Sequence, residues 1–142
     1  MPTYLWTGSS SADWKTAGNW SGGVVPGSGD TVIFNTGAQT ITGTSITGVA
    51  EIKILEGFTG TLGSTGTPLD ASATDLFIST ELGTVNLNGT YTTAHITQTK
   101  ATESAVLFGS SSSITTLRVT GGLGKISVSS STITNVEVSG TP

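Results

Sequence analysis

Few residues of this sequence could carry out chemistry, and carboxylates are the most numerous of them. The chain has nine Asp and Glu, five Lys and Arg, one His and no Cys. Two carboxylates facing one substrate can act as acid and base in polysaccharide hydrolysis, and clustered carboxylate oxygens can bind Ca²⁺. Whether any of them meet depends on the fold, and a repeat in the sequence predicts that fold.

The repeat is clearest near the C-terminus, where residues 114–119 (ITTLRV) recur nineteen residues later as residues 133–138 (ITNVEV). Apolar residues occupy its first, fourth and sixth places. The fourth and sixth lie two residues apart and share one face of a strand, whereas the first is out of phase and predicts a corner before the strand. Looser copies reach back to position 29 at about 10 residues per step, so two steps make one coil of a β-solenoid.

Stacking alternate copies aligns equivalent positions of successive coils. Three columns are apolar and are predicted to face the core: Val49-Ala73-Tyr91-Ile114-Ile133, Ile52-Leu76-Ala94-Leu117-Val136 and Ile54-Ile78-Ile96-Val119-Val138. Two outward columns lie between them: Glu51-Asp75-Thr93-Thr116-Asn135 and Lys53-Phe77-His95-Arg118-Glu137. Two Gly-, Ser- and Thr-rich insertions, at 58–73 and around 102–114, are predicted to be corner loops.

This alignment decides which ionisable residues can meet. Glu51 and Asp75 are neighbours on successive coils, but the next positions of their column supply no third carboxylate or base. His95 is placed on the outward face beside Phe77 and Arg118, as a surface histidine and not as a catalytic base. We therefore expect a protein without catalytic residues, cofactor or metal site.

The predicted fold is all-β: a short parallel β-helix of about five coils, with a Trp-rich cap at residues 1–28 and the solenoid at residues 29–142. Residues 1–28 lack the repeat and contain all three tryptophans, Trp6, Trp14 and Trp20. The end of a solenoid exposes a strand edge and an open core, which bulky aromatic side chains can cover. The alternative is that these rings form an aromatic platform for sugars.

Composition excludes several classes of partner. The net charge is −4 and Lys and Arg form no cluster, which argues against nucleic-acid binding. No stretch has the apolar length of a membrane span, and residues 1–6 lack the basic and apolar regions of a signal peptide. These features predict a protein that is synthesised in the cytoplasm and is not a membrane protein.

The N-terminal segment also carries a resemblance. Trp6-Thr7-Gly8, Asp13-Trp14, Ala17 to Trp20, Gly23 to Pro26 and Gly29 to Phe34 resemble the opening of many bacterial and phage β-helical surface proteins. That group includes autotransporter-like passenger domains and phage virion proteins. The likeness covers about 34 residues, implies a β-helix, and supplies no catalytic residue.

The resemblance implies a structural protein of a phage virion, one that decorates or cements the capsid as a homotrimer and contacts the major capsid protein or another virion protein. The alternative is a carbohydrate-binding or adhesive module on a bacterial cell surface. From the residues themselves we expect the last coil to be an open end, because no aromatic cap follows it. The predicted partner interface there comprises Ile133, Val136, Val138 and Gly140.

Overall fold

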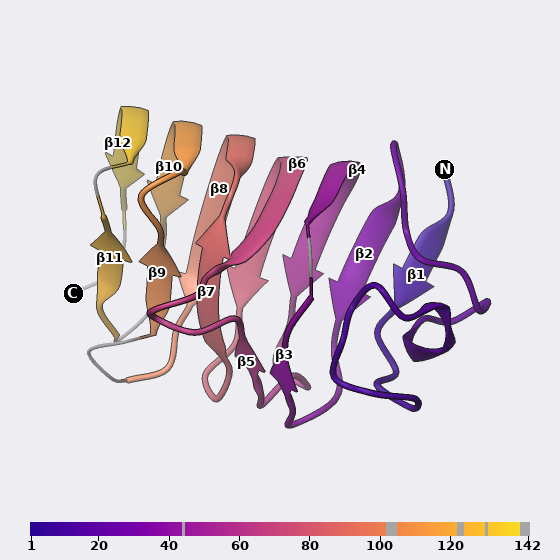
Figure 1. Cartoon of the computed structure of the whole chain (residues 1–142). Helices are drawn as coiled ribbons and strands as arrows, with labels where there is room; N and C mark the ends of the chain where they lie inside the picture. Colours follow the sequence, from indigo (N-terminus) through magenta and orange to yellow (C-terminus); the bar gives the residue numbers. More distant parts are fainter. Residues whose placement is uncertain (44, 102–104, 122–123, 130, 140–142) are drawn as a thin grey trace.

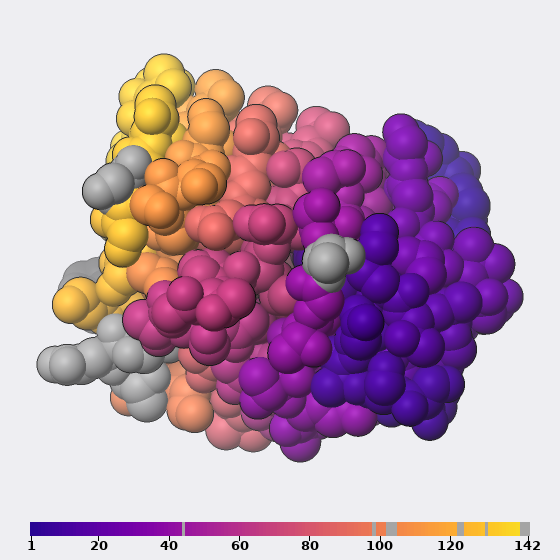
Figure 2. All heavy atoms as spheres, viewed as in Figure 1, coloured from indigo at the N-terminus to yellow at the C-terminus, as the bar shows by residue number. Residues whose placement is uncertain are grey.

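The chain folds into a solenoid of parallel β-strands. The computed structural model describes residues 1–43, 45–101, 105–121, 124–129 and 131–139. Its strands stack as a β-solenoid of about five turns (Figure 1), so the predicted fold class is confirmed. The N-terminal and C-terminal segments lie at opposite ends of the stack, which is also evident in the filled molecule (Figure 2).

Two parallel sheets enclose the core. Sheet 1 contains, in spatial order, β1 (Thr3–Leu5), β2 (Thr31–Phe34), β4 (Ile46–Ile54), β6 (Leu69–Ser79), β8 (Thr90–Gln98), β10 (Ser113–Val119) and β12 (Thr132–Val138). Sheet 2 contains β3 (Thr40–Ile41), β5 (Thr61–Leu62), β7 (Thr84–Asn88), β9 (Val106–Phe108) and β11 (Ile126–Val128). A short 3₁₀ turn, Ala17–Asn19, lies in the N-terminal segment.

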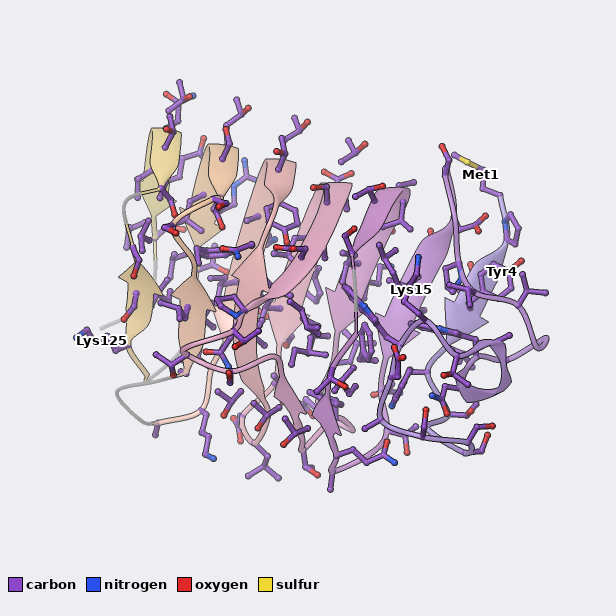
Figure 3. All side chains as sticks on the ribbon, viewed as in Figure 1. Met1, Tyr4, Lys15 and Lys125 are labelled. Atoms are coloured by element: carbon purple, nitrogen blue, oxygen red, sulfur yellow. The ribbon has the colours of Figure 1, made fainter. Side chains whose placement is uncertain are left out.

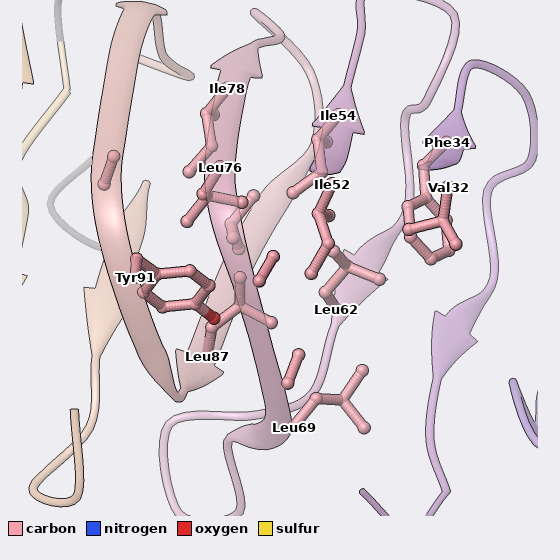
Figure 4. Close-up of a cluster of buried hydrophobic side chains, with 14 of the residues drawn as sticks. Val32, Phe34, Ile52, Ile54, Leu62, Leu69, Leu76, Ile78, Leu87 and Tyr91 are labelled. Carbon is pink, nitrogen blue, oxygen red and sulfur yellow. The ribbon is translucent and has the colours of Figure 1, made fainter. Parts of the chain in front are cut away.

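The register between coils agrees with the predicted columns. Ile54 pairs with Ile78, Ile78 with Ile96, Ile96 with Val119 and Val119 with Val138. The other two apolar columns and both outward columns also have their predicted partners. Figure 4 shows members of neighbouring coils packed side by side in the core. Each coil thus buries its apolar face against the next. This requirement gives the sequence its regular spacing of apolar residues.

One predicted feature, the corner before each strand of sheet 1, is wrong. The strands β4, β6 and β8 are 9 to 11 residues long and run through that position. Val49 and Ile52 are both buried, with two half-exposed residues between them instead of one. The ladder survives because the next coils have the same irregularity: Ala73 pairs with Tyr91 on one side of it and Leu76 with Ala94 on the other.

The first insertion is also not a corner loop. Leu62 pairs with Val85 and Leu69 pairs with Leu87, so residues 63–68 leave sheet 2 in its middle and return to it. The excursion covers Asn86, whose side-chain amide donates to the main-chain oxygen of Leu62 at 3.1 Å. A polar side chain therefore replaces part of the ladder that the excursion interrupts. Residues 102–104 of the second insertion lie outside the described residues.

Buried hydroxyl groups bond the main chain of the preceding coil. Thr80 Oγ1 donates to the carbonyl of Phe58 at 2.9 Å, and Ser112 Oγ donates to that of Leu87 at 3.3 Å. Ser131 Oγ, which is only partly buried, donates to the main-chain oxygen of Gly109 at 2.7 Å. A buried carbonyl without a partner is destabilising, so these bonds give the Ser- and Thr-rich composition a structural role.

Candidate partner interface at the open end

The N-terminal end of the solenoid is closed by the three tryptophans. Trp6, Trp14 and Trp20 are only 1–2% exposed and belong to the same apolar cluster as the first coil. The Trp20 ring contacts Trp6 and Phe34 edge-on, at centroid distances of 5.3 and 5.5 Å. Rings buried to this extent cannot form an exposed platform for a sugar, which removes the alternative reading of this segment.

Asn19 fixes the path of the chain around these rings. It is fully buried, and its Oδ1 accepts from the main-chain N–H groups of Ser10 and Ser11, both at 2.8 Å. Its Nδ2 donates to Ser11 Oγ and to the main-chain oxygen of Asp13. One side chain thus satisfies four partners. Sequence reasoning noted Asn19 only as part of a motif, because hydrogen bonds that turn a loop leave no periodic signal.

The strand edge at this end is also covered. β1 lies within the segment predicted to be only a cap, and it extends sheet 1 by pairing in parallel with β2. On its other side, the main-chain oxygen of Leu5 accepts from the N–H of Ser21 at 2.9 Å, and its N–H donates to Ser21 Oγ at 2.8 Å. Ser21 therefore occupies, at Leu5, the edge at which another strand would add.

The opposite end is open. Among the described residues β12 pairs only with β10, and β11 pairs only with β9 (Figure 1). Val136 and Val138 are 60% and 75% exposed, although the residues one coil inward in their columns, Leu117 and Val119, are buried and half-buried. Ile133 is half-buried, and Gly140 lies outside the described residues. The apolar columns of the core thus reach solvent at this end.

The free edge of β12 offers main-chain groups as well as apolar side chains. The N–H of Ser139 donates to the carbonyl of Val119 on β10 at 2.9 Å. Because successive residues of a strand direct their N–H and C=O groups to opposite sides, Val138 and Val136 direct theirs away from β10. Two residues thus expose both an apolar side chain and an unpaired peptide group. This combination is a template for the addition of another strand.

One ion pair lies on the outer face of the open end. Arg118 Nε and Glu137 Oε2 are 2.8 Å apart, on adjacent strands as the predicted register requires. Both side chains are about half exposed, so the pair contributes little to stability, roughly 0–1 kcal/mol. It does neutralise Glu137, which is the carboxylate closest to the free edge. Lys125 lies at the same end of the molecule (Figure 3).

The residues considered for catalysis lie on the outer face of sheet 1. Glu51 and Asp75 are ladder neighbours, and Lys53 Nζ is 3.4 Å from Glu51 Oε1. His95 Nε2 is 3.1 Å from Thr120 Oγ1, and the ring packs edge-on against Phe77. Within the described residues, no three His, Cys, Asp or Glu side chains gather closely enough to hold a metal ion.

A hydroxyl-lined groove follows one corner of the solenoid and was not foreseen from the sequence. Its volume is about 250 Å³. The lining includes Ser45, Thr47, Asp70, Ser72, Asn88 and Thr90. Tyr91 is buried nearby, and its pKa is raised far above the usual value by burial and, second, by the charge of Asp70. The groove thus combines several hydroxyl groups with one carboxylate.

No protein-family model, curated protein or solved structure matches the chain. No helix among the described residues has the length and apolar character needed to cross a membrane.

Proposed function

We propose that this protein is a non-enzymatic structural component of a phage virion, where it decorates or cements the capsid. The observation that carries the proposal is the contrast between the two ends of the solenoid. One end is closed by buried tryptophans, and the other presents Val136, Val138 and the free edge of β12. Such a surface suits a protein whose role is to join other protein chains.

Two further points support a structural role in the virion. The N-terminal segment resembles the opening of phage and bacterial β-helical proteins, and the residues of that segment build the closed end. Strands that pair only with neighbouring coils, on a core without cysteine, make a stable body from burial and main-chain hydrogen bonds. Analogy with virion proteins favours a trimer whose copies meet at the open end or seat it on the major capsid protein.

Intact particles test the proposal. Antibodies raised against the purified chain should label the heads of phage particles from the source culture in a regular pattern by electron microscopy. The chain should also sediment with particles through a density gradient at a fixed ratio to the capsid protein. If the chain stays in the soluble lysate and particles remain unlabelled, the virion role is wrong.

The second candidate is a carbohydrate-binding or adhesive module of a bacterial surface protein. The corner groove favours it, because hydroxyl groups and the carboxylate of Asp70 can bond the hydroxyl groups of a saccharide. A glycan array distinguishes the two candidates. Strong binding to one saccharide class that Asp70→Asn abolishes would support the module, whereas an empty array combined with labelled particles would exclude it.

A further inference from the structure

We propose that the open end of the solenoid binds a second copy of this chain, with the two β12 strands pairing antiparallel around a twofold axis. This inference rests on the proposed function, since it names the occupant of the docking end. The contact would extend sheet 1 of one copy directly into sheet 1 of the other. The apolar columns that reach solvent at Val136 and Val138 would then continue across the contact.

The difference between the ends disfavours a head-to-tail stack. For β12 to pair with β1 of another copy, the edge of β1 would have to be free. Ser21 already bonds both main-chain groups of Leu5 on that edge, at 2.9 and 2.8 Å. An edge that cannot pair with the opposite end of its copy can still pair with its own equivalent, which is the geometry of a closed, isologous contact.

The side chains of β12 select the register of this pairing. Val136 and Val138 direct their main-chain groups outward, so an axis that passes through Glu137 places Val136 opposite the partner's Val138. Each such pair can exchange two hydrogen bonds, and the valine side chains meet on the core side. An axis through Val136 would instead place Val138 opposite the partner's Thr134, an exposed polar residue.

Charge allows the contact and also limits its strength. An axis through Glu137 brings the two Glu137 carboxylates face to face. In each copy, Arg118 Nε lies 2.8 Å from the Glu137 Oε2 of the same chain and offsets its charge. Positions 105–139 contain two basic residues and one acidic residue, whereas positions 1–99 contain seven carboxylates and two lysines. Joining two open ends therefore keeps the acidic parts of the two copies far apart.

The resulting dimer is a rod with the same tryptophan-closed end at both extremities. A rod with twofold symmetry presents two identical surfaces in opposite directions, so it can bridge two equivalent sites across a local twofold axis of a shell. This shape fits a cement role and differs from the trimer that analogy favours.

The mass of the purified 142-residue chain in solution is the first test. Sedimentation equilibrium should give twice the 14.3 kDa protomer mass. Val136→Lys should return the chain to a monomer, because it places a charge at the centre of the apolar contact. Val24→Lys is the matched control, since Val24 is a similarly exposed valine, at 52%, near the closed end.

Cross-linking tests the register and does not depend on a disruptive variant. The chain has no cysteine, so a single introduced thiol gives an unambiguous result. Glu137→Cys should form an intermolecular disulfide on mild oxidation, because residues facing each other across such an axis have Cα atoms about 4.5 Å apart. Arg118→Cys breaks the same ion pair but lies one strand further from the axis on each copy, and it should not cross-link.

A wild-type chain that stays monomeric or forms a trimer would overturn the inference. So would a Val24→Lys variant that dissociates as readily as Val136→Lys. Equal cross-linking of the Glu137→Cys and Arg118→Cys variants would overturn it as well. None of these results would contradict the proposed role in the virion. That role depends on particle labelling, and labelled particles together with a monomeric chain would refute the twofold contact alone.

Discussion

Removing the Trp20 side chain should destabilise the whole fold. The ring is 2% exposed and makes edge-on contacts with Trp6 and Phe34. Truncating a buried Trp to Ala typically costs about 3–5 kcal/mol, and aromatic pairs contribute roughly 0.5–1.5 kcal/mol each beyond burial. We therefore expect Trp20→Ala to lower the free energy of unfolding by at least roughly 3 kcal/mol. For a chain of this length that corresponds to a fall in Tm of about 10 °C or more.

The ring and its N–H group can be separated. Trp20 Nε1 donates to the main-chain oxygen of Trp14 at 2.7 Å. Trp20→Phe keeps an aromatic ring but removes this hydrogen bond, at a cost of about 0.5–1.5 kcal/mol. Urea unfolding followed by circular dichroism gives both free energies, and Val24→Ala at an exposed site is the control. A loss below about 1 kcal/mol in Trp20→Ala would mean that the closed end does not stabilise the stack.

Three further perturbations have defined outcomes. Asn19→Ala removes four hydrogen bonds from a buried site and should lower the free energy of unfolding in urea by more than about 2 kcal/mol; an unchanged midpoint would contradict this. Gly89→Ala would press a Cβ against the main-chain oxygen of Ala71 and should be strongly destabilising, whereas Gly27→Ala, with open space around the new Cβ, should be neutral by the same assay. Because burial raises the pKa of Tyr91, its phenolate forms only in the unfolded chain, so stability should fall as pH rises above about 10. Tyr91→Phe should abolish that fall, and a pH profile unchanged by the substitution would refute it.

The sequence predicted the stacking of coils in detail because burial there has a fixed period. Each coil must place apolar side chains above those of its neighbour, so positions such as Ile54, Ile78 and Ile96 reveal their register by type and spacing. The outward pairing of Arg118 with Glu137 followed from the same alignment and is confirmed by their 2.8 Å contact.

Features without a period were not predictable. The strand β1 is three residues long and pairs through main-chain groups that any sequence carries. The excursion at residues 63–68 looked like a corner because Gly, Ser and Thr occur in both, and only the pairing of Leu69 with Leu87 shows that it interrupts a sheet. The corner groove gathers short polar side chains from several coils, each unremarkable in its own segment.

The candidate interface was predictable only in part. An uncapped last coil was visible in the sequence, and the structure adds that Val136 and Val138 expose their main-chain groups together with their side chains. Sequence patterning gave no sign that Ser21 covers the opposite edge, because that contact joins two irregular segments.

The placement of the closed end has a consequence for how the chain is made. A ribosome releases the N-terminus first, so the tryptophan cluster and the strands β1 and β2 can assemble before later coils are synthesised. Each new coil of about 20 residues then folds onto an edge that already exists, because its ladder contacts are with the preceding coil. The free edge of the last folded coil acts as a template for the next coil. Once that coil has folded, it covers this edge and presents a free edge of its own. Among the described residues β12 is the last such template, and the coils before it are already folded when it is synthesised.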